Sequence, residues 1–168
     1  SRVYTGCLNG IDSEKVTVEV DLCAGIPNLV IVGLPDTSVN ESKERIKAAI
    51  KNAGFEFPLK KIVVNLAPAH LRKEGTGFDL PLCIGILLAS EMLAPADFLK
   101  KTCFIGEVSL DGSLRGVHGV LSMTMMAKAE GFSYVVVPEE NRLEASLVEG
   151  VEVFGLSHLS ELPILLMN

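Results

Sequence analysis

A long apolar segment directly after a glycine-containing loop constrains this chain more than any other feature. The segment covers residues 80–93, "LPLCIGILLASEML", and the loop before it reads "RKEGTGFD". It is too short to span a bilayer, which takes about 20 residues, and too long for an ordinary strand. A helix that is apolar on nearly every side has to be buried on nearly every side. We therefore predict one central buried helix that begins at Asp79, where a carboxylate suits the helix dipole.

Several other segments have the pattern of β-strands. Residues 16–22 alternate apolar and polar side chains and predict a half-exposed strand, whereas the continuously apolar residues 29–34 predict a buried one. Three more apolar runs predict strands at residues 61–66, 134–138 and 151–156. Residues 102–117 predict two short strands joined at Asp111-Gly112, since this dipeptide favours a type I′ turn.

Helices are predicted between these strands. Ser38 and Glu41 have the spacing of a capping box, and Gly54 is placed to end the helix that follows. Residues 120–129 and 141–148 predict two further helices. Helical crossovers favour parallel pairing of the strands that they join. The sequence therefore predicts a mixed α/β fold, and we expect residues 1–168 to form a single domain.

Composition indicates what kind of protein this is and where it is located. The 168 residues are 48% apolar and carry a formal charge of −6, which allows one core and gives no overall basic footprint for nucleic acid. The four cysteines show neither a C-x-x-C pair nor histidines at metal-ligand spacing, so we expect reduced thiols, no metal site and a cytoplasmic location. Cys23, Cys83 and Cys103 lie in apolar runs and are predicted to be core residues.

No membrane segment or signal peptide is expected. No apolar run is long enough to cross a bilayer, and charged residues interrupt the N-terminal region from Arg2 onward. The chain does not begin with Met, and we expect it to be part of a longer protein.

The glycine loop raises the question of phosphate binding. The chain has no G-x-x-x-x-G-K-[ST] motif, and in "GTGFDL" Leu80 stands where a Rossmann loop has its third glycine. Gly75 and Gly77 still precede a helix N-terminus, which can bind an anion without a named motif. The carboxylate of Asp79 would repel that anion.

A hydrolase is a second possibility. No G-x-S-x-G elbow is present. Thr76 and Ser122 are conceivable nucleophiles and Lys73 a conceivable base, but no spacing selects them. The histidines lie in loops or at element ends, where surface positions are common: His70, His118 and His158.

Basic residues near the central strand give a third possibility. Lys60 and Lys61 precede the strand at residues 61–66 or begin it, and Arg72 and Lys73 follow it. Arg115 lies in another glycine-containing loop, beside His118. Because ligands of α/β proteins often bind at strand ends, these basic side chains are candidate contacts for nucleic-acid phosphates.

Three long motifs resemble a known family. They are "GLPDTSVNESKERIKAAI", "NLAPA" with "KEG" and "FDLP", and "GEVSLDGSLRGV". In this order they are similar to the N-terminal domain of the ComM/YifB family of Mg-chelatase-like AAA+ ATPases. The likeness covers almost the whole chain. One position departs from the family, which usually carries Asp where this chain has His70.

The resemblance implies a fold like the proteolytic domain of Lon protease, also called ribosomal-protein-S-five-domain-two-like. It implies that an AAA+ domain follows, with ATP and Mg²⁺ bound there and no cofactor in this chain. ComM-type proteins are hexameric helicases that promote branch migration in recombination and natural transformation. The implied partners are the chain's own AAA+ domain, neighbouring subunits and DNA, with no membrane. This domain is then expected to aid ring assembly and DNA guidance.

The resemblance also bears on catalysis. Alignment with the Lon nucleophile loop pairs Lys73, Glu74 and Gly75 with its first residues and places Gly77 at the nucleophile position. The position of the catalytic lysine falls on Leu121. Because neither residue can perform the chemistry, the domain is expected to be non-catalytic. The remaining candidates for loop or interface contacts are Glu74, Gly75, Asp79 and His118.

Other functions stay open at this point. One is a Lon-like ATP-dependent peptidase with a non-standard nucleophile, and another is a free-standing nucleic-acid-binding module. A third is a small-molecule kinase, which the same general fold also hosts, although fold-level analogy is a weak argument.

Overall fold

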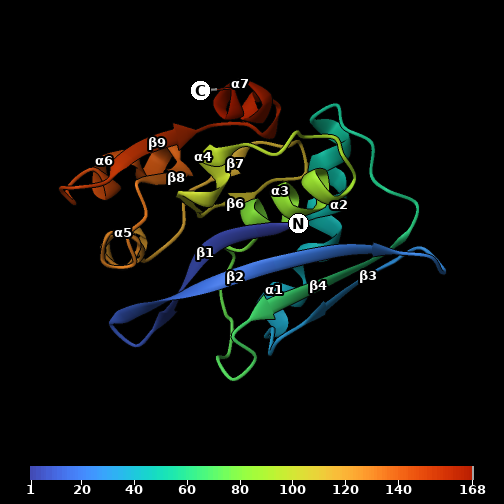
Figure 1. Cartoon of the computed structure of the whole chain (residues 1–168), viewed down its shortest axis with the longest axis horizontal. Helices are drawn as coiled ribbons and strands as arrows, with labels where there is room; N and C mark the ends of the chain where they lie inside the picture. The colour runs from blue at the N-terminus through green and yellow to red at the C-terminus, as the bar shows by residue number, and fades with distance from the viewer. Residues whose placement is uncertain (168) are drawn as a thin grey trace.

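The computed structural model describes residues 1–167 and shows one seven-stranded sheet with helices on both faces (Figure 1). The strand order is β3-β4-β2-β1-β5-β8-β9, and β6 and β7 form a separate two-stranded hairpin. The strands are β1 Arg2–Asn9, β2 Asp12–Cys23, β3 Asn28–Val32, β4 Lys61–Ala67, β5 Thr102–Phe104, β6 Glu107–Val108, β7 Leu114–Arg115, β8 Tyr134–Pro138 and β9 Glu152–Leu156. The predicted mixed α/β fold is confirmed.

The sheet has two halves that meet at β1. In the first half β2 is antiparallel to both β1 and β4, and β3 runs parallel to β4. In the second half β5, β8 and β9 are all parallel. A single register pair, Tyr4 with Cys103, joins β1 to β5. The first half is thus a hairpin-based sheet, and the second is a parallel sheet made by helical crossovers.

Short and medium helices connect these strands. They are α1 Thr37–Asn40, α2 Ser42–Asn52, α3 Asp79–Ala89, α4 Asp97–Lys100, α5 Val120–Ala129, α6 Arg142–Ala145 and α7 Leu162–Leu166, with 3₁₀ turns η1 Glu139–Asn141 and η2 Leu159–Glu161. The central helix predicted after the glycine loop is α3, and every residue from Asp79 to Leu87 is buried.

The sheet separates two apolar cores. Alternate residues of β1 and β2, such as Val3 and Val18, point toward α3 and belong to the larger core. Met123 and Met126 of α5 pack on the opposite face, because a side chain added at Gly6 of β1 would meet both of them. Two helical layers therefore enclose the middle of the sheet, as required when strands are buried on both sides.

Several predictions at element ends were wrong. Asp36, and not Ser38, caps the first helix: its carboxylate accepts the backbone N–H of Val39 at 3.0 Å. The strand predicted to be buried at residues 29–34 is the sheet edge β3, and Val32 is 44% exposed. The β6–β7 turn is not type I′, since Gly112 has positive φ and Asp111 does not.

Candidate functional site

The loop between β4 and α3, residues 68–78, is held against the edge strand. The backbone N–H of Lys73 donates to the carbonyl of Leu34, and the N–H of Asp36 donates to the carbonyl of Lys73, both at 2.9 Å. The N–H of Gly75 donates to Ser38 Oγ at 2.9 Å. The loop therefore has a defined path, fixed by the segment that leads from β3 into α1.

Lys73 lies inside the protein with no exposed surface. Its ammonium donates to the carbonyl of Gly33 at 2.7 Å and to the carbonyl of Pro68. Burial lowers the pKa of Lys73 from its ordinary value. The expectation that Lys73 offers its charge to nucleic acid at the surface is wrong, because the buried ammonium instead joins the start of the loop at Pro68 to the end of the edge strand at Gly33.

Asp79 is also removed from the surface. Its carboxylate accepts two hydrogen bonds from Arg45, at 3.0 and 3.1 Å, and one from the N–H of Val108 at 3.1 Å. Burial raises the pKa of Asp79 to about 6, while Arg45 and the Val108 amide act in the opposite direction. Asp79 was predicted as a loop or interface contact, but the residue is buried within the domain and fastens the start of α3 to α2 and β6.

The backbone amides at this helix end are occupied. The N–H of Asp79 donates to the carbonyl of Thr76, and that of Leu80 donates to the carbonyl of Gly106. The carbonyl of Gly77 in turn accepts the N–H of Gly106 at 3.0 Å. The N–H groups of Asp79 and Leu80 are therefore not available to a phosphate, which argues against an anion site on the first turn of α3.

A small hollow of about 140 Å³ lies beside the glycine loop. Glu74, Thr76 and Gly77 line it from the loop, Cys7 from β1, and His118 from the segment before α5. Burial raises the pKa of the Cys7 thiol, so the reactive thiolate form is disfavoured. This hollow is the candidate functional site, because it contains the position aligned with the Lon nucleophile.

The two positions aligned with the Lon catalytic dyad, the nucleophile and the lysine, do not both line the hollow. Gly77 lines the hollow, whereas Leu121 does not and is 38% exposed on α5. Ser122, a conceivable nucleophile, bonds to Ser13 Oγ at 2.8 Å and to the carbonyl of Ile11 at 3.1 Å. These bonds tie Ser122 to the turn between β1 and β2.

The predicted basic residues do not form one surface. Lys60 and Lys61 lie at the start of β4, and Arg72 follows its other end, about 20 Å away for a strand of this length. Arg72 is exposed and forms a long ion pair with Glu74, at 3.9 Å. Arg115 is exposed on β7, where its Nε donates to Ser109 Oγ at 2.6 Å.

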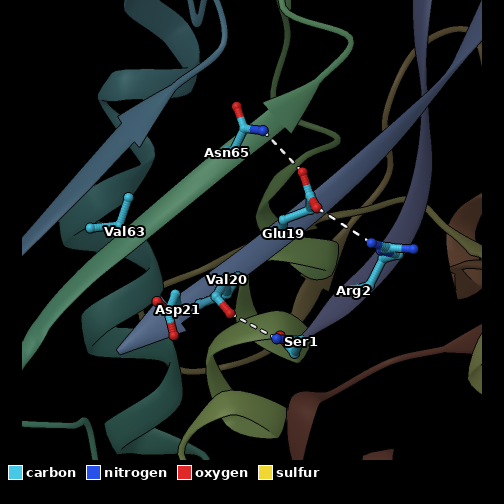
Figure 2. Close-up of a pocket in the computed structure, with 7 residues that line it drawn as sticks. All are labelled: Ser1, Arg2, Glu19, Val20, Asp21, Val63 and Asn65. Carbon is cyan, nitrogen blue, oxygen red and sulfur yellow. Dashed lines mark hydrogen bonds and ion pairs between the residues drawn. The ribbon is translucent and has the colours of Figure 1, made fainter. Parts of the chain in front are cut away.

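A second depression, of about 600 Å³, lies on the face of β2 and β4 that α5 leaves uncovered (Figure 2). Figure 2 shows Glu19 of β2 between two partners: Asn65 donates to it at 2.9 Å, and Arg2 lies 3.6 Å from it. These contacts use the polar side chains for cross-strand pairing. We therefore assign no chemistry to this depression.

Two further observations concern metal binding and membrane crossing. Within residues 1–167, no cluster of three or more His, Cys, Asp or Glu side chains is arranged to hold a metal ion. None of the helices in that part of the chain has the length and apolar character that crossing a bilayer requires.

Comparison with known proteins identifies the family. The family model described as subunit ChlI of Mg-chelatase matches residues 18–141. This chain belongs to the ChlI family. The ChlI match runs from the middle of β2 to η1 and includes the glycine loop, whereas the β1 residues that line the hollow lie before it.

Curated relatives of this ChlI-family chain include proteins of the resembled type. YifB of Escherichia coli, an uncharacterised protein, is 42% identical over 95% of this chain, and competence protein ComM of Haemophilus influenzae is 45% identical over 87%. The resemblance to the ComM/YifB family is confirmed. This chain covers only 31% of the length of YifB and 28% of ComM.

Lon protease is a more distant relative of the ChlI-family chain. The Lon protease of Lachnoclostridium phytofermentans is 26% identical over 90% of this chain. The predicted Lon-like fold is confirmed by this match together with the mixed α/β architecture.

Sequence reasoning missed the partner of Asp79 and the position of Cys7. Arg45 of α2 was not among the predicted site residues, and no local pattern links it to Asp79, which lies 34 positions along the chain. Cys7 was not among the predicted core cysteines but is buried, whereas Cys23 was predicted buried and is only half-buried.

Proposed function

We propose that this chain is the non-catalytic Lon-like domain of a longer, ATP-driven DNA-processing protein of the ComM/YifB type. In this proposal the longer protein is a cytoplasmic AAA+ ATPase and hexameric helicase that promotes branch migration in recombination and natural transformation. ATP and Mg²⁺ bind in a downstream AAA+ domain. The domain described here helps to assemble the ring and to guide DNA toward it.

The vacant Lon dyad is the observation that carries the non-catalytic part. Gly77 has no side chain to act as a nucleophile, and Leu121 has no group that takes up a proton. The neighbouring Lys73 does not replace the missing base, because its ammonium donates to two backbone carbonyls inside the protein. In this proposal the domain shares the Lon fold but lacks the Lon catalytic residues.

Exposed apolar side chains on α5, on α6 and just after α6 support the role in assembly. Met125 is 58% exposed, and Leu143 and Leu147 are each 73% exposed. Leu121 lies nearby, since its backbone N–H donates to Glu144 of α6 at 3.2 Å. Clustered exposed apolar side chains mark interaction surfaces more often than isolated ones do. We assign this surface to contacts with a neighbouring subunit or with the AAA+ domain.

A peptidase assay tests the non-catalytic claim. We expect no hydrolysis of casein or a fluorogenic peptide above background, with or without ATP and Mg²⁺. A residual peptidase is the alternative with some structural support, because Thr76 and His118 line the same hollow. Activity that disappears in Thr76→Ala and persists in Ser122→Ala would establish that alternative. Saturable ATP binding by this chain alone would instead favour a kinase.

The assembly role is tested in the longer protein. The Leu143→Glu and Leu147→Glu double variant should sediment as smaller species than wild type. Leu110→Glu is the control, since Leu110 is also exposed, at 57%, but lies in the turn between β6 and β7. Equal assembly of the double variant and wild type would remove this surface from the ring.

A further inference from the structure

A groove rich in lysine runs along the solvent face of α2. Four lysines line a cavity of about 230 Å³ between α2, the start of β3 and the segment before β4: Lys43, Lys47, Lys51 and Lys60. A second cavity, of about 830 Å³, continues from it and shares Lys51, Phe57 and Lys60. We call the two together the lysine groove. In Figure 1, α2 and the loop from it to β4 lie at the end of the molecule opposite α5 and α6.

The spacing of three of these lysines follows from the helix. Lys43, Lys47 and Lys51 are four residues apart and therefore lie on one face, about 6 Å from one to the next along the axis. Lys60 completes the row from the neighbouring segment. A row of cations at regular intervals suits a polymer with regularly repeated negative charges.

None of these four ammonium groups forms an ion pair or hydrogen bond with another group in residues 1–167. Two carboxylates also line the groove, Glu44 in the first cavity and Glu56 in the second. The groove thus keeps an excess of positive charge in a chain whose formal charge is −6. Such a local excess attracts anionic partners although the whole chain is acidic.

The floor and rim of the groove are apolar. Phe57 lines both cavities and is half-buried against the core, and Phe55 lines the second cavity. Leu59 is 85% exposed beside them. Proteins that bind single-stranded nucleic acid combine a positive groove with aromatic rings on which bases stack. A duplex has its bases paired inside and would make no use of these rings.

We propose that the lysine groove binds single-stranded nucleic acid, with the lysines contacting phosphates and Phe57 offering its ring to a base. The inference rests on the proposed DNA role of the domain, and it assigns that role to α2 rather than to the predicted Arg72 and Arg115. An acidic protein segment would satisfy the lysines, but it would have no bases to stack on Phe57.

Fluorescence anisotropy with a labelled single-stranded oligothymidylate tests the proposal. The variant Lys47→Glu, Lys51→Glu, Lys60→Glu should bind at least tenfold more weakly than wild type. Each lost phosphate contact should also reduce the log–log salt slope by about 0.7. The control with the same charge change is Lys100→Glu, Lys101→Glu, Lys128→Glu, whose lysines are exposed outside the groove and should matter little.

A second variant tests the aromatic contact. Phe57→Leu keeps an apolar side chain in the core but removes the ring, and it should weaken oligothymidylate binding several-fold while leaving binding of polyglutamate unchanged. If polyglutamate binds wild type as well as DNA does and Phe57→Leu changes neither, the groove takes an acidic protein segment. Tighter binding of duplex than of single strand would also overturn the assignment.

The outcomes separate this inference from the proposed function. If wild type binds the oligonucleotide and the groove and control variants lose affinity equally, the groove is excluded, but a DNA role elsewhere on the domain stands. If wild type does not bind at all, both the groove and DNA guidance by this domain are excluded. The peptidase result is independent of either outcome.

Discussion

Lys73 Nζ donates a hydrogen bond of 2.7 Å to the carbonyl of Gly33, so a charged side chain inside the protein joins the glycine loop to the end of the edge strand. The same ammonium donates to the carbonyl of Pro68 at the beginning of the loop. This cation adds to the backbone hydrogen bonds that hold the loop against the edge strand, and three predictions concern this region and the start of α3.

The first prediction concerns Lys73 itself. Lys73→Met keeps the apolar volume but leaves the carbonyl of Gly33 without a donor and that of Pro68 with only the long bond from the N–H of Leu71, at 3.4 Å, which should lower the unfolding free energy by roughly 1–3 kcal/mol. Arg72→Met is the neighbouring control and should change it by less than about 0.5 kcal/mol, because Arg72 is exposed. Urea denaturation measures both. Similar stability of the two variants would mean that the Lys73 hydrogen bonds contribute little.

The second prediction concerns two glycines. A Cβ at Gly33 would lie 2.2 Å from the carbonyl oxygen of Leu66, and Gly33 has a φ of +103°. Gly33→Ala should therefore cost at least about 3 kcal/mol or prevent folding. At Gly77 the nearest contact of a Cβ is Ile105 at 3.4 Å, and Gly77→Ala should cost less than about 1 kcal/mol. Thermal unfolding compares them, and a stable Gly33→Ala protein would contradict the close approach of β3 to β4.

The third prediction is a pH dependence. Asp79 has a higher pKa folded than unfolded, so between 3.8 and about 6 the folded protein holds its proton more tightly. Its contribution to stability is therefore present at low pH and is lost as the pH rises through that range. Arg45→Ala removes the main group that lowers this pKa. The variant should lose more unfolding free energy at pH 8 than at pH 5.

The control for this experiment is the Arg45→Ala, Asp79→Asn double variant, which has no carboxyl at that position. The extra loss of unfolding free energy at pH 8 that we expect for Arg45→Ala should be absent from the double variant. An equal loss in Arg45→Ala at both pH values would show that Arg45 does not lower the pKa of Asp79.

The fourth prediction concerns the cysteines. Cys23 is half-buried, whereas Cys7, Cys83 and Cys103 are buried, and burial raises the pKa of Cys103 to about 12. Because the thiolate is the reactive form, one thiol per folded molecule should react quickly with a colorimetric thiol reagent. Cys23→Ser should abolish this fast phase, and all remaining thiols should react in denaturant. A fast phase that persists in Cys23→Ser would contradict the burial of the other three.

The elements that could be predicted from the sequence are those with a local pattern. The buried helix α3 is apolar on every side, and β2 alternates clearly, so both were predicted close to their observed positions. The first strand β1 was not predicted as such, because the apolar residues of "RVYTGCLN" neither alternate nor form a continuous run. Its burial depends on neighbours from β2, α3 and α5, which no local pattern reveals.

The features of the candidate site also fall into those that local sequence predicts and those that depend on distant contacts. Alignment of the linear motifs was enough to place Gly77 and Leu121 at the positions of the Lon nucleophile and catalytic lysine. The burial of Lys73 and the Arg45–Asp79 pair depend on contacts between residues more than 30 positions apart. A lysine in a polar loop looks solvated until the loop is seen to fold back on β3. The continuous apolar run at β3 was misplaced for the opposite reason, since one side of an edge strand can stay apolar and exposed.

The place of β1 in the middle of the sheet has a consequence for how the chain is made. The β1–β2 hairpin is complete once residue 23 has left the ribosome, but β5, the other neighbour of β1, ends at residue 104. Throughout that interval of translation one edge of β1 is unpaired, and an unpaired strand edge can pair with other chains. Because β1 lies between β2 and β5, a fragment that started after Asn9 would keep the other strands of both halves and lose the strand that joins them.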